Sequence, residues 1–196
     1  MVEFGALGTV EGVDFSPEAI EFCRRRGVQA AHQGRIENLA FDDALFDLIL
    51  ATDVIEHLPD DRAALAELRR VAAPGGRLLA TVPAYQWLWS RHDVSHQHYR
   101  RYTLRRLRER LQASGWEPQV WSYFNTALLP PIAAVRLLGR TRGNGDGERP
   151  DLELTPPGLN RLLGQPMRLE AALIGRGARL PAGVSIGLVA VAGDRP

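Results

Sequence analysis

Strand-like and helix-like segments alternate along most of this chain, and that alternation limits the folds open to it. Residues 10–14, 46–51 and 77–82 are short apolar runs of strand length, and residues 28–31, after Gly27, are a further strand candidate. Residues 60–72 carry apolar side chains at helical spacing and stop before Pro74–Gly75–Gly76, a strong helix breaker. Strands that alternate with helices predict an α/β fold with a mostly parallel sheet and helices on both faces.

The length of 196 residues suits one domain with a substantial core, so we expect a single domain over residues 1–196. Residues 140–157 are rich in Gly, Pro and charge and are expected to form a mobile loop. The expected parts of the domain are a core at residues 10–83, elaborations at residues 84–103 and 126–173, and a last strand at residues 184–192.

Composition excludes several classes of protein. The net charge of +1 gives no broad field that would attract nucleic acid or an anionic membrane. The single cysteine, Cys23, forms neither an internal disulfide nor a cysteine-based zinc site. No signal peptide is visible, and the longest apolar stretch, residues 127–138, is too short to span a membrane. We expect a cytoplasmic protein without a transmembrane segment, and the oligomeric state is left open.

An acid stands at the end of the first predicted strand. Asp14 follows Gly12–Val13 and precedes Ser16–Pro17, an N-cap and first-turn proline that begin a helix. Such an acid can accept both ribose hydroxyls of a nucleoside, and Phe15 beside it can pack on adenine. The alternative is that Asp14 only assists the helix cap. Taken alone, the acid fits NAD equally well.

The segments that follow decide between these cofactors. They form one ordered series, Gly34–Arg35–Ile36–Glu37–Asn38–Leu39, Phe41–Asp42–Asp43, Phe46–Asp47–Leu48–Ile49, Asp53–Val54–Ile55–Glu56–His57–Leu58 and Pro74–Gly75–Gly76–Arg77–Leu78–Leu79. With the acid before it, the series resembles the class I methyltransferases that use S-adenosylmethionine, in the quinone-methyltransferase-like group. The resemblance covers residues 10–83 without a break. An NAD-dependent oxidoreductase or epimerase is disfavoured because the chain has no Lys for a Tyr-x-x-x-Lys pair.

The resemblance implies a Rossmann-like sheet, S-adenosylmethionine as cofactor and a role for each matching position. Arg35 departs from the family, which commonly has an acid there, so a side-chain contact to the adenine amino group would be lost. The implied cofactor-binding residues are Asp14 at the ribose, Phe15 at adenine, Arg35 and Ile36 at the adenine edge, Thr52 and Asp53 beside the sulfonium, and Val54 and His57 at the pocket floor.

Beyond the core, residues 98–103 match a His-x-Arg-Arg-Tyr-Thr signature of a bacterial subgroup of these enzymes. A neutral imidazole suits a general base near pH 7, so His98 is the first catalytic candidate. Tyr85 and Tyr102 join it as catalytic candidates, with His92 and Asn125 lining the acceptor pocket. The alternative is that His98 and Tyr102 only hydrogen-bond this segment to the sheet.

Two further patterns in this region admit more than one interpretation. His92, Asp93, His96 and His98 invite a metal site, but no third clear ligand is fixed by the sequence, so no metal is expected. The arginines of residues 100–110 interleave with a leucine stripe, which favours a solvated outer face. The sharper alternative is that they dock an anionic acceptor, such as a phosphorylated lipid or sugar. Nucleic acid is not expected as a partner.

The family's first strand and its Gly-x-Gly-x-Gly turn have no counterpart here, because only nine residues precede Val10. We therefore expect the first strand and first helix to be largely missing, with an open slot in the sheet. The expected function is S-adenosylmethionine-dependent methyl transfer to a small-molecule acceptor by a chain truncated at its N-terminus. The alternative is a catalytically inactive methyltransferase-like subunit that serves binding or assembly.

Overall fold

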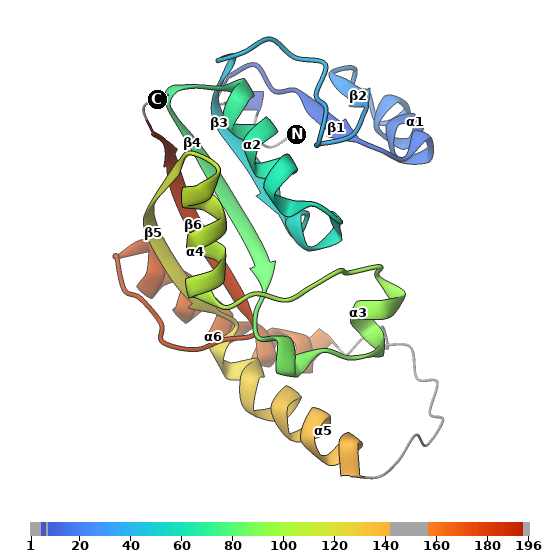
Figure 1. Ribbon diagram of the computed structural model, residues 1–196. Helices are drawn as coiled ribbons and strands as arrows, with labels where there is room; N and C mark the ends of the chain where they lie inside the picture. Colours follow the sequence, from blue (N-terminus) through green and yellow to red (C-terminus); the bar gives the residue numbers. More distant parts are fainter. Residues whose placement is uncertain (1–4, 7, 142–156, 194–196) are drawn as a thin grey trace.

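The computed structural model describes residues 5–6, 8–141 and 157–193, and it alternates strands and helices as expected (Figure 1). The strands are β1 (Gly12–Asp14), β2 (Ala31–Gln33), β3 (Phe46–Thr52), β4 (Ala72–Pro83), β5 (Trp116–Phe124) and β6 (Ser185–Ala192). The α-helices are α1 (Pro17–Arg25), α2 (Asp61–Val71), α3 (Arg91–Ser95), α4 (Leu104–Ala113), α5 (Leu129–Thr141) and α6 (Pro157–Gly175). Short 3-10 helices are η2 (Ile55–His57), η3 (Gln86–Leu88) and η4 (Thr126–Leu128).

The strands form two sheets. A four-stranded sheet has the order β3-β4-β6-β5, and a separate two-stranded sheet pairs β1 with β2. β3 and β4 are parallel, and β6 is antiparallel to both β4 and β5, so β3, β4 and β5 run in one direction. The mixed α/β class with a mostly parallel, Rossmann-like sheet is therefore confirmed, with β6 as the one reversed strand of the larger sheet.

The core lies on one face of the four-stranded sheet. Along β4, Leu78, Ala80 and Val82 are buried and alternate with side chains that are less buried, as the two-residue period of a strand requires. α2 and α4 cover this face, and their leucine stripes include the buried Leu65 and Leu107 (Figure 1). These helices fix the sheet, and with it the loops at the ends of the strands.

The opposite face of the sheet is less covered. Leu48 and Leu50 of β3 and Val120 of β5 are all exposed, although they are large and apolar. α6 contacts β5. Within the described residues, β3 is an edge strand that pairs with β4 alone. Its other side therefore carries no ladder of hydrogen bonds in this part of the chain. This arrangement agrees with the expected open slot beside β3.

The β1-β2 unit, with α1 packed on it, lies beside α2 rather than within the larger sheet (Figure 1). The segment after β2 attaches the β1-β2 unit to the rest of the fold. Phe41 makes edge-to-face ring contacts with His32 of β2 and with Phe46 of β3. Arg70 of α2 donates to the Phe41 carbonyl oxygen at 2.9 Å. These contacts hold the two sheets together without a shared strand.

Two element boundaries differ from the predicted ones. The strand expected at residues 28–31 begins only at Ala31, because the amide of Val28 donates to the Cys23 carbonyl and still belongs to the end of α1. β4 begins at Ala72, before the Pro-Gly-Gly breaker, and the breaker forms a bulge inside the strand. A Cβ on Gly76 would lie 2.8 Å from the Phe46 carbonyl oxygen, so the bulge requires glycine there.

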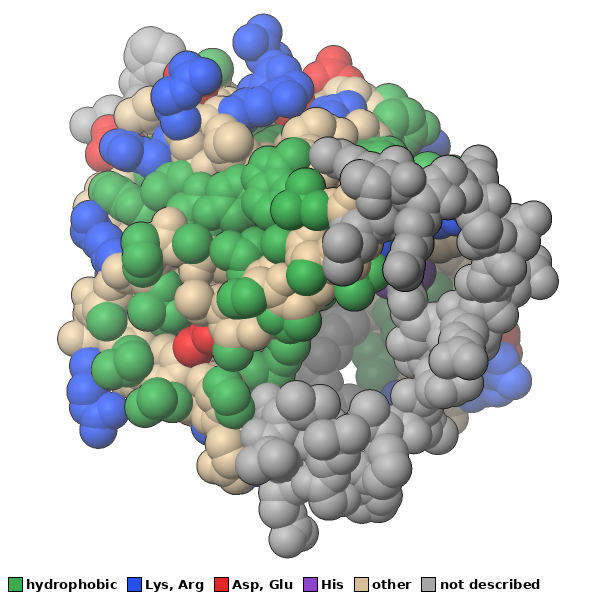
Figure 2. Space-filling view, turned by 90° about the horizontal axis from the view of Figure 1, so that it is seen from below, with side chains coloured by type: hydrophobic (Ala, Val, Ile, Leu, Met, Phe, Trp, Pro, Cys, Tyr) green, Lys and Arg blue, Asp and Glu red, His purple; other side chains and the backbone are tan. Residues whose placement is uncertain are grey.

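α5 and α6 carry an exposed apolar surface. These helices lie in the lower half of Figure 1. Figure 2 views the molecule from below and shows hydrophobic side chains gathered in a broad area. The exposed members on the two helices are Val135, Leu137, Met167, Leu169 and Leu173. None of the helices in the described part of the chain combines the length and hydrophobicity of a membrane span. Most of the loop expected at residues 140–157 lies outside the described residues.

Candidate active site

The strands β3, β4 and β5 end at the same edge of the larger sheet, because they run in the same direction. Their last residues are Thr52, Pro83 and Phe124. The loops after them carry Asp53 to His57, Tyr85 to His98, and Asn125. In open α/β sheets the crevice at the carboxyl ends of the strands is where ligands bind. The topology therefore brings three separate groups of predicted site residues to one edge.

The four residues assigned to the nucleoside lie on the β1-β2 side. Asp14 ends β1 and is exposed, and its Oδ1 accepts a hydrogen bond from the Ser16 amide at 2.9 Å. Phe15 is 73% exposed, so its ring is open to a flat ligand. Ile36 packs partly against the core, whereas Arg35 points outward and pairs with Glu37 at 3.2 Å. Asp14 thus assists the helix cap, as one interpretation held, while remaining accessible to a ligand.

The tip of β3 turns sharply after Thr52. Asp53 has a φ of 52°, a left-handed conformation that is rare outside glycine. Its amide donates to the carbonyl oxygen of Thr81 at 3.0 Å and to the Thr81 hydroxyl at 3.1 Å, which holds the turn against β4. Val54 packs partly against the core. The turn leaves Thr52 and Asp53 exposed at the strand end, where the family resemblance places the sulfonium.

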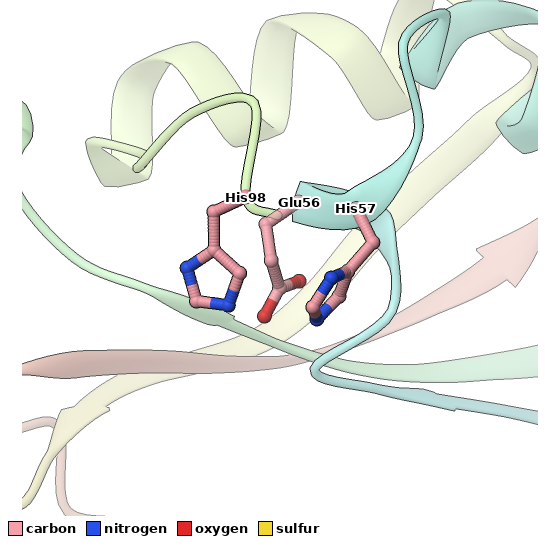
Figure 3. A group of neighbouring side chains, drawn as sticks. All are labelled: Glu56, His57 and His98. Carbon is pink, nitrogen blue, oxygen red and sulfur yellow. The ribbon is translucent and has the colours of Figure 1, made fainter. Parts of the chain in front are cut away.

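Glu56, His57 and His98 form a cluster just beyond this turn. One nitrogen from each histidine and one carboxylate oxygen all lie within 4.8 Å of one another. The two imidazole rings meet edge to face with 4.6 Å between centroids, and the Glu56 carboxyl group lies close to both rings (Figure 3). η2 supplies two of these side chains, and the loop after α3 supplies the third. The amide of Tyr99 donates to the Glu56 carbonyl at 2.7 Å and joins the two segments.

Burial perturbs the titration of this cluster. Glu56 is 1% exposed, and its burial raises the pKa of the carboxyl to about 8, with repulsion from Asp53 and Asp93 adding to the rise. Burial, followed by the charge of His98, lowers the pKa of His57. A carboxyl with a raised pKa beside an imidazole with a lowered pKa is typical of functional sites.

Asp93 orients His98 from behind. Its buried carboxylate accepts from His98 Nδ1 at 3.0 Å, from Arg101 Nε at 2.7 Å and from the Ser90 amide at 2.9 Å. Burial opposes ionisation of Asp93, but the bonds from Arg101 and His98 outweigh it and keep its pKa below the ordinary value. A proton on Nδ1 leaves Nε2 of His98 as the nitrogen with a free lone pair.

The tyrosine candidates occupy different environments. Tyr85 stacks on Tyr123 with 5.2 Å between ring centroids and on Trp87 with 5.8 Å, and burial raises its pKa to about 12. Tyr102 is fully buried, and its hydroxyl donates to Asp61 Oδ2 at 2.9 Å. A hydroxyl enclosed in this way favours the structural interpretation of Tyr102, in which it ties the segment to α2.

The remaining acceptor candidates are spread along the same edge. Asn125 lines a depression of about 390 Å³ at the end of β5, between Phe124 and α6. The ring centroids of His92, on α3, and His96, at the C-cap of α3, are 4.0 Å apart. His92, His96 and His98 therefore gather, as their spacing suggested. Glu56 was not among the predicted site residues, and the signal available in the sequence was an acid directly before a histidine.

Comparison with known proteins agrees with this geometry. A profile of the family described as "Methyltransferase domain" matches residues 1–80. Over these residues the chain matches a methyltransferase domain, and the comparisons support the class I, S-adenosylmethionine-dependent group. The demethylmenaquinone methyltransferase of Staphylococcus epidermidis is 32% identical over 97 residues, which cover 44% of this chain and 40% of that protein. The malonyl-[acyl-carrier protein] O-methyltransferase of Serratia marcescens is 40% identical over 73 residues, covering 36% of this chain and 28% of that protein.

Structural similarity extends further than sequence similarity. A S-adenosylmethionine-dependent methyltransferase of Methanosarcina mazei superposes with a TM-score of 0.59 over 99% of this chain and 87% of its own, at 14% identity. At that identity the likeness concerns the fold alone. The matches to both curated relatives cover less than half of their lengths. Sequence similarity over residues 1–80 and fold similarity over most of the chain therefore both point to methyltransferases.

Proposed function

We propose that this protein transfers a methyl group from S-adenosylmethionine to a small-molecule acceptor. The observation that carries the proposal is Asp14, an exposed acid at the end of β1, inside the segment that matches the methyltransferase family. An acid at a strand end accepts both ribose hydroxyls, and the exposed Phe15 beside it offers a face for adenine. Both features would contact the adenosine part of the cofactor.

The other positions extend this proposal along the cofactor. The loop at Arg35 and Ile36 would face the adenine edge, with backbone groups in place of the missing acid. Thr52 and Asp53 would lie beside the sulfonium, with Val54 and His57 beneath it. The acceptor atom attacks the methyl carbon in line, the S–CH₃ bond breaks, and its electron pair stays on sulfur as S-adenosylhomocysteine leaves. Positioning supplies most of the rate enhancement in such a step.

An acceptor with an apolar body suits the acceptor side best. The depression at the end of β5 is lined mainly by apolar groups, including Met167 and Ile174. The quinone acceptor implied by the name of the staphylococcal relative belongs to this chemical class. His98, Tyr85 and Asn125 are the side chains we place nearest to it.

An anionic or lipid-linked acceptor has weaker support. A second depression of about 290 Å³ is lined by Arg62, Arg105, Arg106 and Arg110. Two of these arginines already have partners, since Arg105 pairs with Glu109 at 2.8 Å and Arg110 lies 3.7 Å from Asp61. An anionic headgroup would have to compete with both acids.

The open edge of β3 bears on activity. A further strand between β3 and β1 would pair the free backbone of β3 and bring a glycine-rich turn to the cofactor's methionine group. We infer that such a strand covers this edge in the active enzyme. The alternative is a binding or assembly subunit, in which a partner's strand covers this edge.

Calorimetric titration with S-adenosylhomocysteine tests the proposal, using the 196-residue chain and the protein translated from the complete reading frame that contains it. We expect binding, and we expect Asp14→Ala to weaken it by about 10–100-fold through the loss of two hydrogen bonds to ribose. Asp42→Ala, an acid outside the site, is the matched control and should bind as the parent does. Absence of binding by both proteins would overturn the proposal and favour the assembly role.

A further inference from the structure

Glu56, His57 and His98 have the donor set of a metal site. We propose that these three side chains bind a divalent transition-metal ion of the Zn²⁺ class at the carboxyl edge of the sheet. Two imidazoles and one carboxylate are a recurrent ligand set for catalytic zinc, in which a fourth position stays open. From the sequence no metal is expected, because residues 92–98 offer no third clear ligand. The fold supplies two ligands from η2, more than thirty positions earlier in the chain.

An unsatisfied carboxylate oxygen is the first argument. Glu56 is buried, and its Oε2 has no hydrogen-bond partner among the residues that the structure describes. Burying a carboxylate oxygen without a partner is costly, whereas coordination to a cation removes that cost. Figure 3 shows the Glu56 carboxyl group close to both histidine rings, so a cation bound by one residue would also face the others.

The orientation of His98 is the second argument. Its Nδ1 is bonded to Asp93 Oδ1 at 3.0 Å, which directs Nε2 toward Glu56 and His57. A carboxylate behind a histidine is the usual arrangement that fixes the tautomer and orientation of a metal-binding imidazole. Asp93 is itself held by Arg101 and Ser90, so this support is rigid.

The geometry needs only a small closure. Ligand atoms about 2.0–2.1 Å from a tetrahedral zinc ion stand roughly 3.3 Å apart. The three ligand atoms here lie within 4.8 Å of one another. Small rotations of the side chains therefore bring them to the ion without any change in the backbone, which the Tyr99–Glu56 hydrogen bond already fixes.

Under the proposed function, this ion would act on the acceptor. Its open position lies at the strand edge that we assign to the sulfonium, so it would hold an ionisable acceptor oxygen as the anion, with the proton lost to water on binding. The oxygen then attacks the methyl carbon while the S–CH₃ electron pair stays on sulfur. The ion replaces His98 as the activating group, because a coordinated Nε2 has no lone pair left to accept a proton.

Calorimetry with Zn²⁺ and the visible spectrum with Co²⁺ test the site without any assay of activity. We expect one ion per chain and the strong visible absorption of low-coordinate Co²⁺. Glu56→Gln, His57→Ala and His98→Ala should each abolish that spectrum. Asp93→Asn should weaken Zn²⁺ binding by roughly 10–100-fold, as expected when the partner behind a ligand is lost. Glu56→Gln preserves shape, so it remains informative if a histidine variant unfolds.

Control variants locate the ion. His32→Ala removes a histidine that instead pairs with Glu11 on the β1-β2 side, and it should leave binding unchanged. His92→Ala and His96→Ala test the other adjacent ring pair. The proposal is overturned if the parent shows no stoichiometric ion, or if these two variants lose the ion while Glu56→Gln and His98→Ala keep it. Binding of S-adenosylhomocysteine, measured separately, shows whether the proposed methyl transfer stands or falls independently.

Discussion

Glu67 illustrates how one side chain holds the loop before β3 to α2. Its Oε1 accepts from the Leu39 amide at 2.8 Å and from Arg70 Nη2 at 2.8 Å, and Arg70 continues to Asp43 at 2.7 Å. The hydrogen bonds from Arg70 lower the pKa of the Glu67 carboxyl. The stabilisation that Glu67 provides is therefore complete above the pKa that this carboxyl has in the unfolded chain. It is lost as the pH falls through the lower pKa of the folded state.

We expect Glu67→Gln to reduce the free energy of unfolding by about 1 kcal/mol at neutral pH, after allowance for solvent screening. The difference from the parent should shrink as the pH falls and should be lost below the lowered, folded pKa of Glu67. Urea unfolding across this range measures it. Glu21→Gln, which removes an exposed partner of Arg25 at 3.9 Å, should change stability little at any pH. A constant difference at all pH values would contradict the account.

Tyr102 offers a second test at the residue scale. Its buried hydroxyl donates to Asp61, and burial together with the Asp61 charge raises its pKa. Tyr102→Phe should cost about 1–2 kcal/mol of stability, since it leaves a buried carboxylate short of one donor. Binding of S-adenosylhomocysteine by the folded variant should be unchanged. Tyr99→Phe, at an exposed tyrosine, is the control and should cost almost nothing. Lost binding without lost stability would restore Tyr102 to the ligand site.

At the scale of elements, the segment from η3 to α4 is organised by Asp93. The carboxylate gathers Ser90, His98 and Arg101, and a parallel bridge from Ala84 to Tyr102 closes the segment onto β4. These contacts, rather than regular secondary structure, fix where His98 lies.

Asp93→Asn should therefore loosen this segment more than the rest of the protein. We expect a loss of about 2 kcal/mol in unfolding free energy, because Arg101 is left without its buried partner. Amide hydrogen exchange should accelerate in residues 86–101 while β4 and β6 stay protected. Uniform acceleration throughout the chain would show that the segment has no separate organisation.

The sequence predicted most elements because their signals are local. Ser16, Asp60 and Thr103 each cap the helix that follows, as their side-chain bonds to backbone amides confirm. The start of β2 was predicted too early. The residues directly after Gly27 resemble a strand, but the Val28 amide still bonds to the Cys23 carbonyl at the end of α1. Glu56 and His57 are adjacent in the sequence, but their approach to His98 has no local signal, since it depends on how η2 and residues 96–99 pack together.

At the scale of the whole molecule, the exposed edge and face of β3 predict self-association. Leu48 and Leu50 present apolar surface beside an unpaired strand edge, a combination that promotes edge-to-edge pairing. Leu50→Glu should lower the weight-average mass seen by sedimentation at high protein concentration. Leu45→Glu, at an exposed leucine before the strand, should not. A monomer at all concentrations for the parent would contradict this expectation.

The central claim is that the carboxyl edge of the strands binds S-adenosylmethionine through Asp14 and the turn after β3. Hydrogen exchange with and without saturating S-adenosylhomocysteine tests it most directly, on whichever form binds the ligand in calorimetry. We predict added protection at residues 12–16, 34–36 and 52–57, and none at residues 116–122 in β5. Protection confined to other segments, or no protection anywhere, would contradict the account.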